Sequence, residues 1–288
     1  MHSVGISAKV SSPEAVELAR VTAERLRKRG MSIAFDEASA QELSAPGDRT
    51  LPKADLGHDT DLIITFGGDG TLLSVARHAP DGVPIIGVNM GTLGFLTEIR
   101  VEEFEDVLER VLSNRYEAEA RVTFDVSVSR EDREQKSYRV LNDAVLNKSA
   151  LARMIEMRIN VNGKFLSTFR ADGLIVSTPT GSTAYNLSAG GPIIYPTMEA
   201  MVITPICPHM LSNRPIVLPD HLSVEIGIET ENQKTFLTLD GQEGFPITRE
   251  DRVTVTRSPH TILLVSSPDK SYFDVLRTKL KWGEGTIG

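Results

Sequence analysis

The segment DTDLIITFGGDGTLLSVARHAP, residues 59–80, constrains the fold more than any other part of the sequence. Its apolar residues 61–66 predict a buried strand, the glycines after them predict a tight turn, and a helix is expected from about Thr71. Residues 83–89, VPIIGVN, predict a second strand. Two strands joined through a helix form a βαβ unit, which requires a parallel sheet. The N-terminal part is therefore expected to be an α/β domain.

Two further helices are expected in this part of the chain. Residues 12–30 carry Ser12 as an N-cap, Pro13 in the first turn and Gly30 as a stop. The segment 31–35 then predicts a strand, and a polar stretch with Pro and Gly, residues 36–60, separates it from the strand at 61–66. In EEFEDVLERVLSN, residues 102–114, apolar residues recur at helical spacing.

The periodicity changes near residue 118. Apolar residues alternate with polar ones from about 120 to 265, and Asn162-Gly163 is a strong signal for a two-residue hairpin. The tail returns to helical spacing, with Phe273, Leu276 and Leu280 on one stripe, and is expected to pack on the first domain. We expect a Rossmann-like α/β domain with a parallel sheet over 1–118, completed by 266–288, and a β-rich domain over 119–265.

Composition excludes several classes of function. A formal net charge of -8 over 288 residues argues against a broad nucleic-acid-binding face. The N-terminus lacks the apolar core of a signal peptide, and no apolar run approaches the roughly 18 residues that span a membrane. Cys207 is the single cysteine, so an intramolecular disulfide is excluded, and it is expected as a buried thiol near a packing His209. We expect a soluble cytoplasmic protein.

The glycine turn after the strand at 61–66 is suited to phosphate. Gly67, Gly68 and Gly70 allow backbone N–H groups to approach an anion, and the helix that begins near Thr71 offers it a positive end. Tight packing alone is the alternative explanation for such a turn. The sequence contains no G-x-x-x-x-G-K-[ST], and the spacing of this turn is not G-x-G-x-x-G, so the turn matches neither of the two common nucleotide-binding patterns.

Asp69 is unusual because a carboxylate beside a phosphate is repelled unless something compensates its charge. It could hold Mg²⁺, or it could accept the proton of a hydroxyl that attacks a phosphoryl group. The third possibility is an Asp that bonds its own turn.

Two segments further along the chain suit a nucleotide. Residues 171–194 are dominated by Ser, Thr, Gly and Ala around Tyr185, so a ligand can approach the backbone while the ring offers a flat face to a base. Asn142 and Asp143 are an adjacent amide and acid that could chelate ribose hydroxyls. A plain loop and an Asx turn explain these two segments equally well.

Taken together, GGDGTLL, LNDAVLNK, DGLIVSTPTGSTAYNLSAGGPI, TPICPH and LDGQ resemble the signature series of NAD kinases, in the same order and along nearly the whole chain. GGDG alone is shared with diacylglycerol and sphingosine kinases, whereas TPTGSTAY is not. The resemblance implies phosphorylation of the 2'-hydroxyl of the adenosine ribose of NAD by ATP, or by polyphosphate, with a divalent cation such as Mg²⁺. It also implies a homodimer or homotetramer.

The resemblance makes Asp69 the proton acceptor and Gly67, Gly68, Gly70 and Thr71 the phosphate loop. It assigns contacts with the substrates to fifteen residues: Asp69, Gly70, Asn142, Asp143, Arg153, Arg170, Asp172, Thr180, Thr183, Ala184, Tyr185, Asn186, Leu187, Ser188 and Gln242.

Two other functions share parts of this pattern. A lipid kinase of related fold would use the same GGDG, but the chain has no basic amphipathic stretch for a membrane surface. A protein that binds NAD without turnover would have little use for Asp69.

Overall fold

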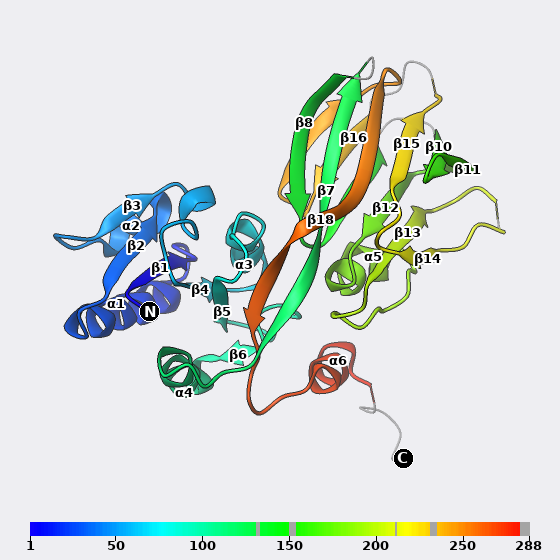
Figure 1. Cartoon of the computed structure of the whole chain (residues 1–288). Helices are drawn as coiled ribbons and strands as arrows, with labels where there is room; N and C mark the ends of the chain where they lie inside the picture. The colour runs from blue at the N-terminus through cyan, green and yellow to red at the C-terminus, as the bar shows by residue number, and fades with distance from the viewer. Residues whose placement is uncertain (131–132, 150–153, 211, 231–234, 283–288) are drawn as a thin grey trace, which may run out of the picture. The chain divides into compact units, whose positions relative to one another are not determined.

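The computed structural model describes residues 1–130, 133–149, 154–210, 212–230 and 235–282 (Figure 1). The chain divides into two compact units. The first comprises Met1–Ala120 with Ile262–Gly288, and the second comprises Arg121–Thr261. Among the helices of these described stretches, none is long and apolar enough to cross a membrane.

A parallel sheet forms the centre of the first unit, in the order β3-β2-β1-β4-β5, and both β6 and the end of β18 pair with β5 in parallel. Its strands are β1 (Ser3–Ala8), β2 (Ser32–Asp36), β3 (Arg49–Leu51), β4 (Leu62–Gly67), β5 (Pro84–Asn89), β6 (Ile99–Arg100) and the last residues of β18 (Asp251–Val265). The expected parallel sheet is therefore confirmed.

The helices of this unit are α1 (Pro13–Lys28), α2 (Glu37–Leu43), α3 (Asp69–Ala76), α4 (Val101–Leu112) and α6 (Tyr272–Leu280). As expected, α1 begins after Ser12, whose side chain accepts from the N–H of Ala15 at 3.3 Å. The apolar faces of α1 and α4 close one core with the sheet, and Phe104 of α4 packs edge-on against Phe66 of β4. The apolar face that helical spacing indicates in residues 102–114 is therefore buried in this core.

The C-terminal segment belongs to this unit, as the sequence predicted. Lys270 Nζ lies 2.5 and 2.7 Å from the carboxylate oxygens of Glu103, and it donates to the carbonyl oxygen of Glu98 at 3.2 Å. In α6 the buried residues are Val275 and Leu276. The expected contact of Phe273 is wrong, because its ring is 56% exposed.

Two sheets form the second unit. One joins β11-β10-β15-β18 with β7 and β8, and the other is antiparallel in the order β14-β13-β12-β9-β16-β17. The strands are β7 (Ala118–Arg130), β8 (Arg133–Val140), β9 (Asp143–Lys148), β10 (Ile155–Val161), β11 (Lys164–Ala171), β12 (Gly173–Ser177), β13 (Ala200–Ile206), β14 (Ile216–Pro219), β15 (Val224–Ile228), β16 (Thr235–Leu239) and β17 (Glu243–Ile247). The short helix is α5 (Tyr185–Ser188).

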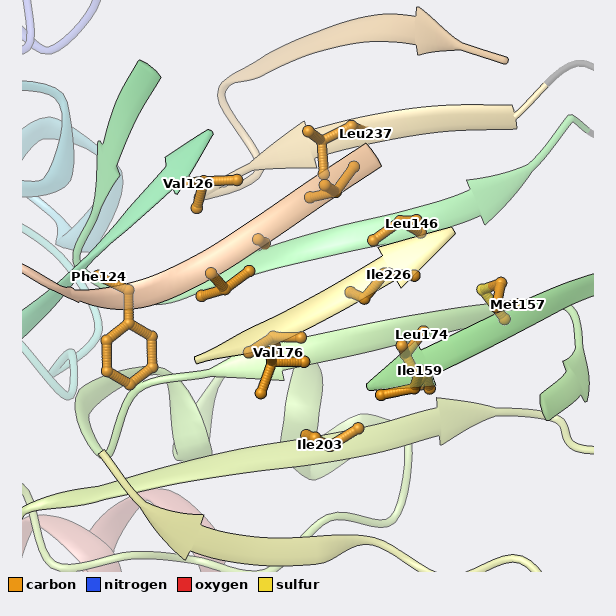
Figure 2. Close-up of a cluster of buried hydrophobic side chains, with 14 of the residues drawn as sticks. Phe124, Val126, Leu146, Met157, Ile159, Leu174, Val176, Ile203, Ile226 and Leu237 are labelled. Carbon is orange, nitrogen blue, oxygen red and sulfur yellow. The ribbon is translucent and has the colours of Figure 1, made fainter. Parts of the chain in front are cut away.

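Side chains from both sheets make the core of the second unit. Figure 2 shows Phe124 of β7, Met157 of β10 and Ile226 of β15 in the same cluster as Leu174 of β12 and Leu237 of β16. Alternation along each strand puts every second side chain into this cluster. The β-rich fold expected for this part of the chain is confirmed.

Local signals were accurate where a turn dictated the backbone. Asn162 and Gly163 join β10 to β11 with φ of 47° and 71°, the left-handed values that a two-residue hairpin turn requires. The polar stretch 36–60 also contains regular structure, namely α2 and β3, for which no pattern had been recognised.

Candidate active site

The glycine turn lies where β4 ends and α3 begins. Gly67 is explained by packing, because a Cβ at that position would lie 2.3 Å from Thr71 Oγ1. Packing does not explain Gly68 or Gly70, since no atom of the described residues lies within 4 Å of where their Cβ would be. The space beside these two glycines is open at the N-terminus of α3.

The carboxylate of Asp69, the first residue of α3, accepts four hydrogen bonds from one neighbouring segment. The N–H of Phe95 donates to Oδ2 at 2.9 Å. Oδ1 accepts from the N–H of Leu96 at 3.2 Å, and from the N–H and the Oγ1 of Thr97 at 2.9 and 2.8 Å. These donors compensate the negative charge locally. No pattern in the sequence indicates that residues 94–97 lie around Asp69.

A cavity of about 310 Å³ opens in the second unit. It combines four of the fifteen residues that the resemblance assigned to substrate contacts with the turn after β16. Its lining comprises Asn142, Asp143, Val145, Asn147, Ala184, Tyr185, Thr238, Asp240 and Gly241. The ring of Tyr185 is 42% exposed at this cavity. Asn142, Asp143 and Tyr185 are thus brought together.

Asp240 fixes the backbone of the Asn142-Asp143 pair. Its carboxylate accepts from the N–H groups of Leu141, Asn142 and Asp143 at 3.0, 2.7 and 3.1 Å. Asp240 is 6% exposed and has φ of 50°, with Gly241 next to it at 65°. The LDGQ turn therefore holds the backbone of the pair in place through hydrogen bonds from its N–H groups to Asp240. No spacing in the sequence indicates this contact.

The side chains of the pair remain available. Within the described residues, neither the amide of Asn142 nor the carboxyl of Asp143 makes a hydrogen bond. Burial, with a smaller contribution from the charge of Asp240, raises the pKa of Asp143 from its ordinary 3.8 to about 7. Asp143 can therefore carry a proton near neutral pH.

The loop after β12 packs closely on the same pair. The N–H of Thr178 donates to the carbonyl oxygen of Asn142 at 2.9 Å. A Cβ at Gly181 would lie 2.1 Å from that oxygen, so only glycine fits. Thr180 begins a 3₁₀ turn, Thr180–Thr183, and its hydroxyl is buried without a hydrogen-bond partner among the described residues. This loop holds Ala184 and Tyr185 beside the cavity.

Other residues assigned by resemblance have different surroundings. Asn186 is fully buried, where its amide donates to Ser182 and Pro192 carbonyls and accepts from Thr204 Oγ1. Leu187 is half-buried, and Ser188 is exposed. The ligand contacts of these three residues stay predictions.

Arg170, Asp172 and Gln242 do not line the cavity. Arg170 is exposed with its Nε 3.8 Å from Glu156, while Asp172 lies 3.0 Å from Lys148 Nζ. Gln242 is exposed in the turn after Asp240. Arg153 lies outside the described residues. Their roles in binding also stay predictions.

Cys207 corrects one expectation, because its thiol is exposed. The residue has φ of 45°, and this turn, shaped by prolines on both sides, directs the side chain outward. The backbone N–H of His209 donates to the carbonyl oxygen of Arg170 at 2.9 Å.

Comparison with known proteins agrees with both units. The model of the ATP-NAD kinase N-terminal domain matches residues 4–116, and that of the ATP-NAD kinase C-terminal domain matches residues 141–267. The NAD kinase of Geotalea daltonii is 48% identical over 285 residues, 99% of this chain and 100% of the relative. That of Geobacter sulfurreducens is 46% identical with the same coverage.

Two solved structures are similar over almost the entire chain. Yeast NADH kinase complexed with NADH has a TM-score of 0.85 at 28% identity, covering 99% of this chain and 89% of its own. An NAD kinase from Archaeoglobus fulgidus in complex with ATP has a TM-score of 0.75 at 25% identity, covering 96% and 99%. With both of its halves matched by family models and relatives matched end to end, the chain belongs to the NAD kinase family.

Proposed function

We propose that the protein transfers the γ-phosphoryl group of ATP to the 2'-hydroxyl of the adenosine ribose of NAD, which gives NADP. The match of both halves of the chain to ATP-NAD kinase models carries this assignment. The similar solved structures hold NADH and ATP, the two classes of ligand that the reaction needs.

The cavity of the second unit is the proposed site of NAD. Among its polar groups, the amide of Asn142 and the carboxyl of Asp143 make no hydrogen bond to another described residue, and Tyr185 adds an exposed ring. An amide and an acid can hold ribose hydroxyls, while a ring suits the face of adenine or nicotinamide.

The glycine turn of the first unit is the proposed site of the ATP phosphates. Gly68 and Gly70 border open space at the N-terminus of α3, where the positive end of the helix dipole favours an anion. Asp69 accepts the proton of the hydroxyl as that oxygen attacks the γ-phosphorus and the bond to the departing ADP breaks. Asp69 lies in the turn that is proposed to hold the phosphates, so its negative carboxylate is placed to accept the proton that the attacking hydroxyl releases.

The divalent cation is proposed to arrive with ATP. Within the described residues there is no cluster of three or more His, Cys, Asp or Glu side chains that could hold a metal ion. Mg²⁺ commonly keeps several waters and binds substrate phosphates with only one or two carboxylates. Bound in that way, it offsets the charge of the phosphates.

The direct test is to incubate the purified protein with NAD, ATP and Mg²⁺ and to follow NADP with a coupled dehydrogenase. We expect NADP to accumulate with NAD, and no phosphorylation of diacylglycerol vesicles. The same assay with polyphosphate in place of ATP shows which phosphoryl donor the protein uses. An assay with NADH in place of NAD shows which acceptor it prefers. Labelling of the lipid without NADP formation would contradict the proposal.

Tyr185→Ala should raise the KM for NAD about tenfold and leave the melting temperature nearly unchanged, because an exposed ring contributes stacking rather than core packing. Steady-state kinetics and thermal melting measure the two effects. Phe165→Ala is the matched control, since it removes another exposed ring, 55% exposed, outside the cavity. An unchanged KM in the Tyr185 variant would remove this ring from the NAD site.

Gly68→Ala should raise the KM for ATP at least tenfold without destabilising the protein. The backbone of Gly68 has φ of -121°, which alanine adopts freely, and its Cβ would meet no atom of the described residues. Gly67→Ala is the contrasting variant, since its Cβ would collide with Thr71 and should lower the melting temperature. Equal ATP kinetics in wild type and Gly68→Ala would show that phosphate does not approach this turn.

The chain is proposed to act in the cytoplasm as a homodimer or homotetramer. The assembly follows from the family resemblance, and light scattering coupled to size-exclusion chromatography measures it. A monomer that retains full activity would contradict this part of the proposal.

A further inference from the structure

The segment between β5 and β6 surrounds Asp69 with donors that the proposed reaction does not by itself require. Oδ1 accepts three hydrogen bonds and Oδ2 accepts one. A carboxylate oxygen has two lone pairs, so Oδ1 is saturated while Oδ2 can still accept one proton or hydrogen bond. The two oxygens of Asp69 are therefore not equivalent.

The hydroxyl of Thr97 is oriented by a second side chain. Asn89, the last residue of β5, donates from Nδ2 to Thr97 Oγ1 at 2.9 Å, and its own Oδ1 accepts from the N–H of Gly91 at 2.8 Å. The contact with Gly91 fixes which way the amide is turned. Thr97 Oγ1 thus accepts from Asn89, which leaves its single hydrogen for Asp69.

Burial makes this arrangement rigid. Thr97 is fully buried and Asn89 is 5% exposed. Asn89 Nδ2 also donates to the carbonyl oxygen of Thr92 at 2.9 Å, so one amide holds both ends of the segment. A Cβ at Gly94 would lie 1.9 Å from Asp69 Oδ1, which means that only glycine permits this approach.

We propose that Thr97, oriented by Asn89, is a positioning residue that saturates Oδ1 of Asp69 and leaves Oδ2 as the oxygen that takes the proton of the attacking hydroxyl. This inference rests on the proposed function. In the step, the hydroxyl oxygen forms a bond to the γ-phosphorus, the bond to the leaving ADP oxygen breaks, and the proton passes to Oδ2. Without the Thr97 hydroxyl, Oδ1 keeps the N–H groups of Leu96 and Thr97 but loses the only side-chain donor among its three, so the carboxylate is held less firmly.

Thr97→Val tests the hydroxyl with little change in volume. We expect kcat to fall about 10- to 100-fold, because small misplacements of a reacting group are costly, with the KM values for NAD and ATP within about twofold. Thr97→Ser retains the hydroxyl and should stay within about threefold of wild type.

Two further variants separate positioning from stability. Thr65→Val removes a buried hydroxyl from β4, one that does not bond Asp69, and should leave kcat within about twofold. Gly94→Ala retains Thr97, but its Cβ would lie 1.9 Å from Asp69 Oδ1 and 2.6 Å from Thr97 Oγ1 and would force the two atoms to move. It should therefore lose kcat as Thr97→Val does, even if the latter fails to fold. Thermal melting of each variant shows which of them are folded.

The outcomes are distinct. Wild type that forms no NADP refutes the proposed function itself. If wild type is active, the positioning role is refuted when Thr97→Val keeps kcat within about threefold, or when Thr97→Ser loses as much as Thr97→Val. It is also refuted when the KM values for NAD and ATP rise as much as kcat falls, or when a folded Gly94→Ala variant keeps kcat within about threefold of wild type.

Discussion

Asp69→Asn lowers kcat by about 10²–10⁴ and leaves NAD bound, because the amide cannot take the proton of the attacking hydroxyl. The hydrogen bonds around the side chain define a second cost. Both carboxylate oxygens accept backbone N–H groups, so an amide NH₂ must face one of these donors in either orientation. The better orientation opposes only the N–H of Phe95, at a cost of about 1–3 kcal/mol in stability.

That second cost makes a matched control necessary. Asp36→Asn is suitable, because Asp36 is a buried acid at the start of α2 that accepts from the N–H of Ser39 at 2.7 Å. It should lower the melting temperature by a similar amount and leave kcat nearly unchanged. Recovery of the Asp69 variant at high Mg²⁺ or Mn²⁺ would assign metal binding to Asp69 instead. A kcat within a few-fold of wild type in a folded variant would reduce Asp69 to a turn residue.

The elements predicted from sequence were those with a local signature. Helix α1 has a capping serine and a terminal glycine, α4 has a clean apolar face, and Asn162-Gly163 fits one type of turn. Strand β1 was not predicted, because it lies inside the parallel sheet. Both faces of such a strand are buried, so its sequence does not alternate between apolar and polar residues. Phe273 matched a helical stripe but is exposed, because the neighbouring Val275 and Leu276 turn toward the core instead.

Chemistry predicted the candidate site better than it predicted what supports the site. Asn142, Asp143 and Tyr185 line one cavity, while their contacts with NAD stay predictions. Thr97 and Asp240 were missed because each acts on a residue 28 or about 100 positions away through hydrogen bonds, which leave no periodic trace in a sequence. Gly94 could have been noticed only as one glycine in MGTLGF, since its reason lies in the atoms of Asp69.

The stability of the protein should also depend on pH through Asp143. Asp240 accepts three backbone N–H groups, which favour its charged form, whereas Asp143 makes no hydrogen bond to another described residue through its carboxyl. Burial and then the neighbouring charge raise the pKa of Asp143 from 3.8 to about 7. Besides Asp143 and Asp240, the lining of this cavity contains one ionisable side chain, that of Tyr185. Asp143 is therefore the group expected to titrate there near neutral pH.

The sign follows from proton linkage. Between about pH 4 and pH 7 the folded chain keeps the Asp143 proton that the unfolded chain has released, so the contribution of this group to stability falls as pH rises. Its slope is at most about 1.4 kcal/mol per pH unit, and it levels off above pH 7 once both states are ionised. Asp143→Asn removes the slope because an amide does not titrate.

Urea unfolding of wild type and Asp143→Asn at several pH values from about 5 to 8 measures this contribution as a difference between the two proteins. The variant should gain stability relative to wild type as pH rises toward 7, and the difference should then stay constant. Asp240→Asn retains Asp143 but removes the neighbouring charge that raises its pKa. In this variant the pH range over which stability falls should therefore end at a lower pH. A difference between wild type and Asp143→Asn that does not vary with pH would mean that Asp143 is already ionised in the folded protein. Asp143 would then meet the ribose as a charged acceptor rather than as a carboxylic acid able to donate its proton in a hydrogen bond.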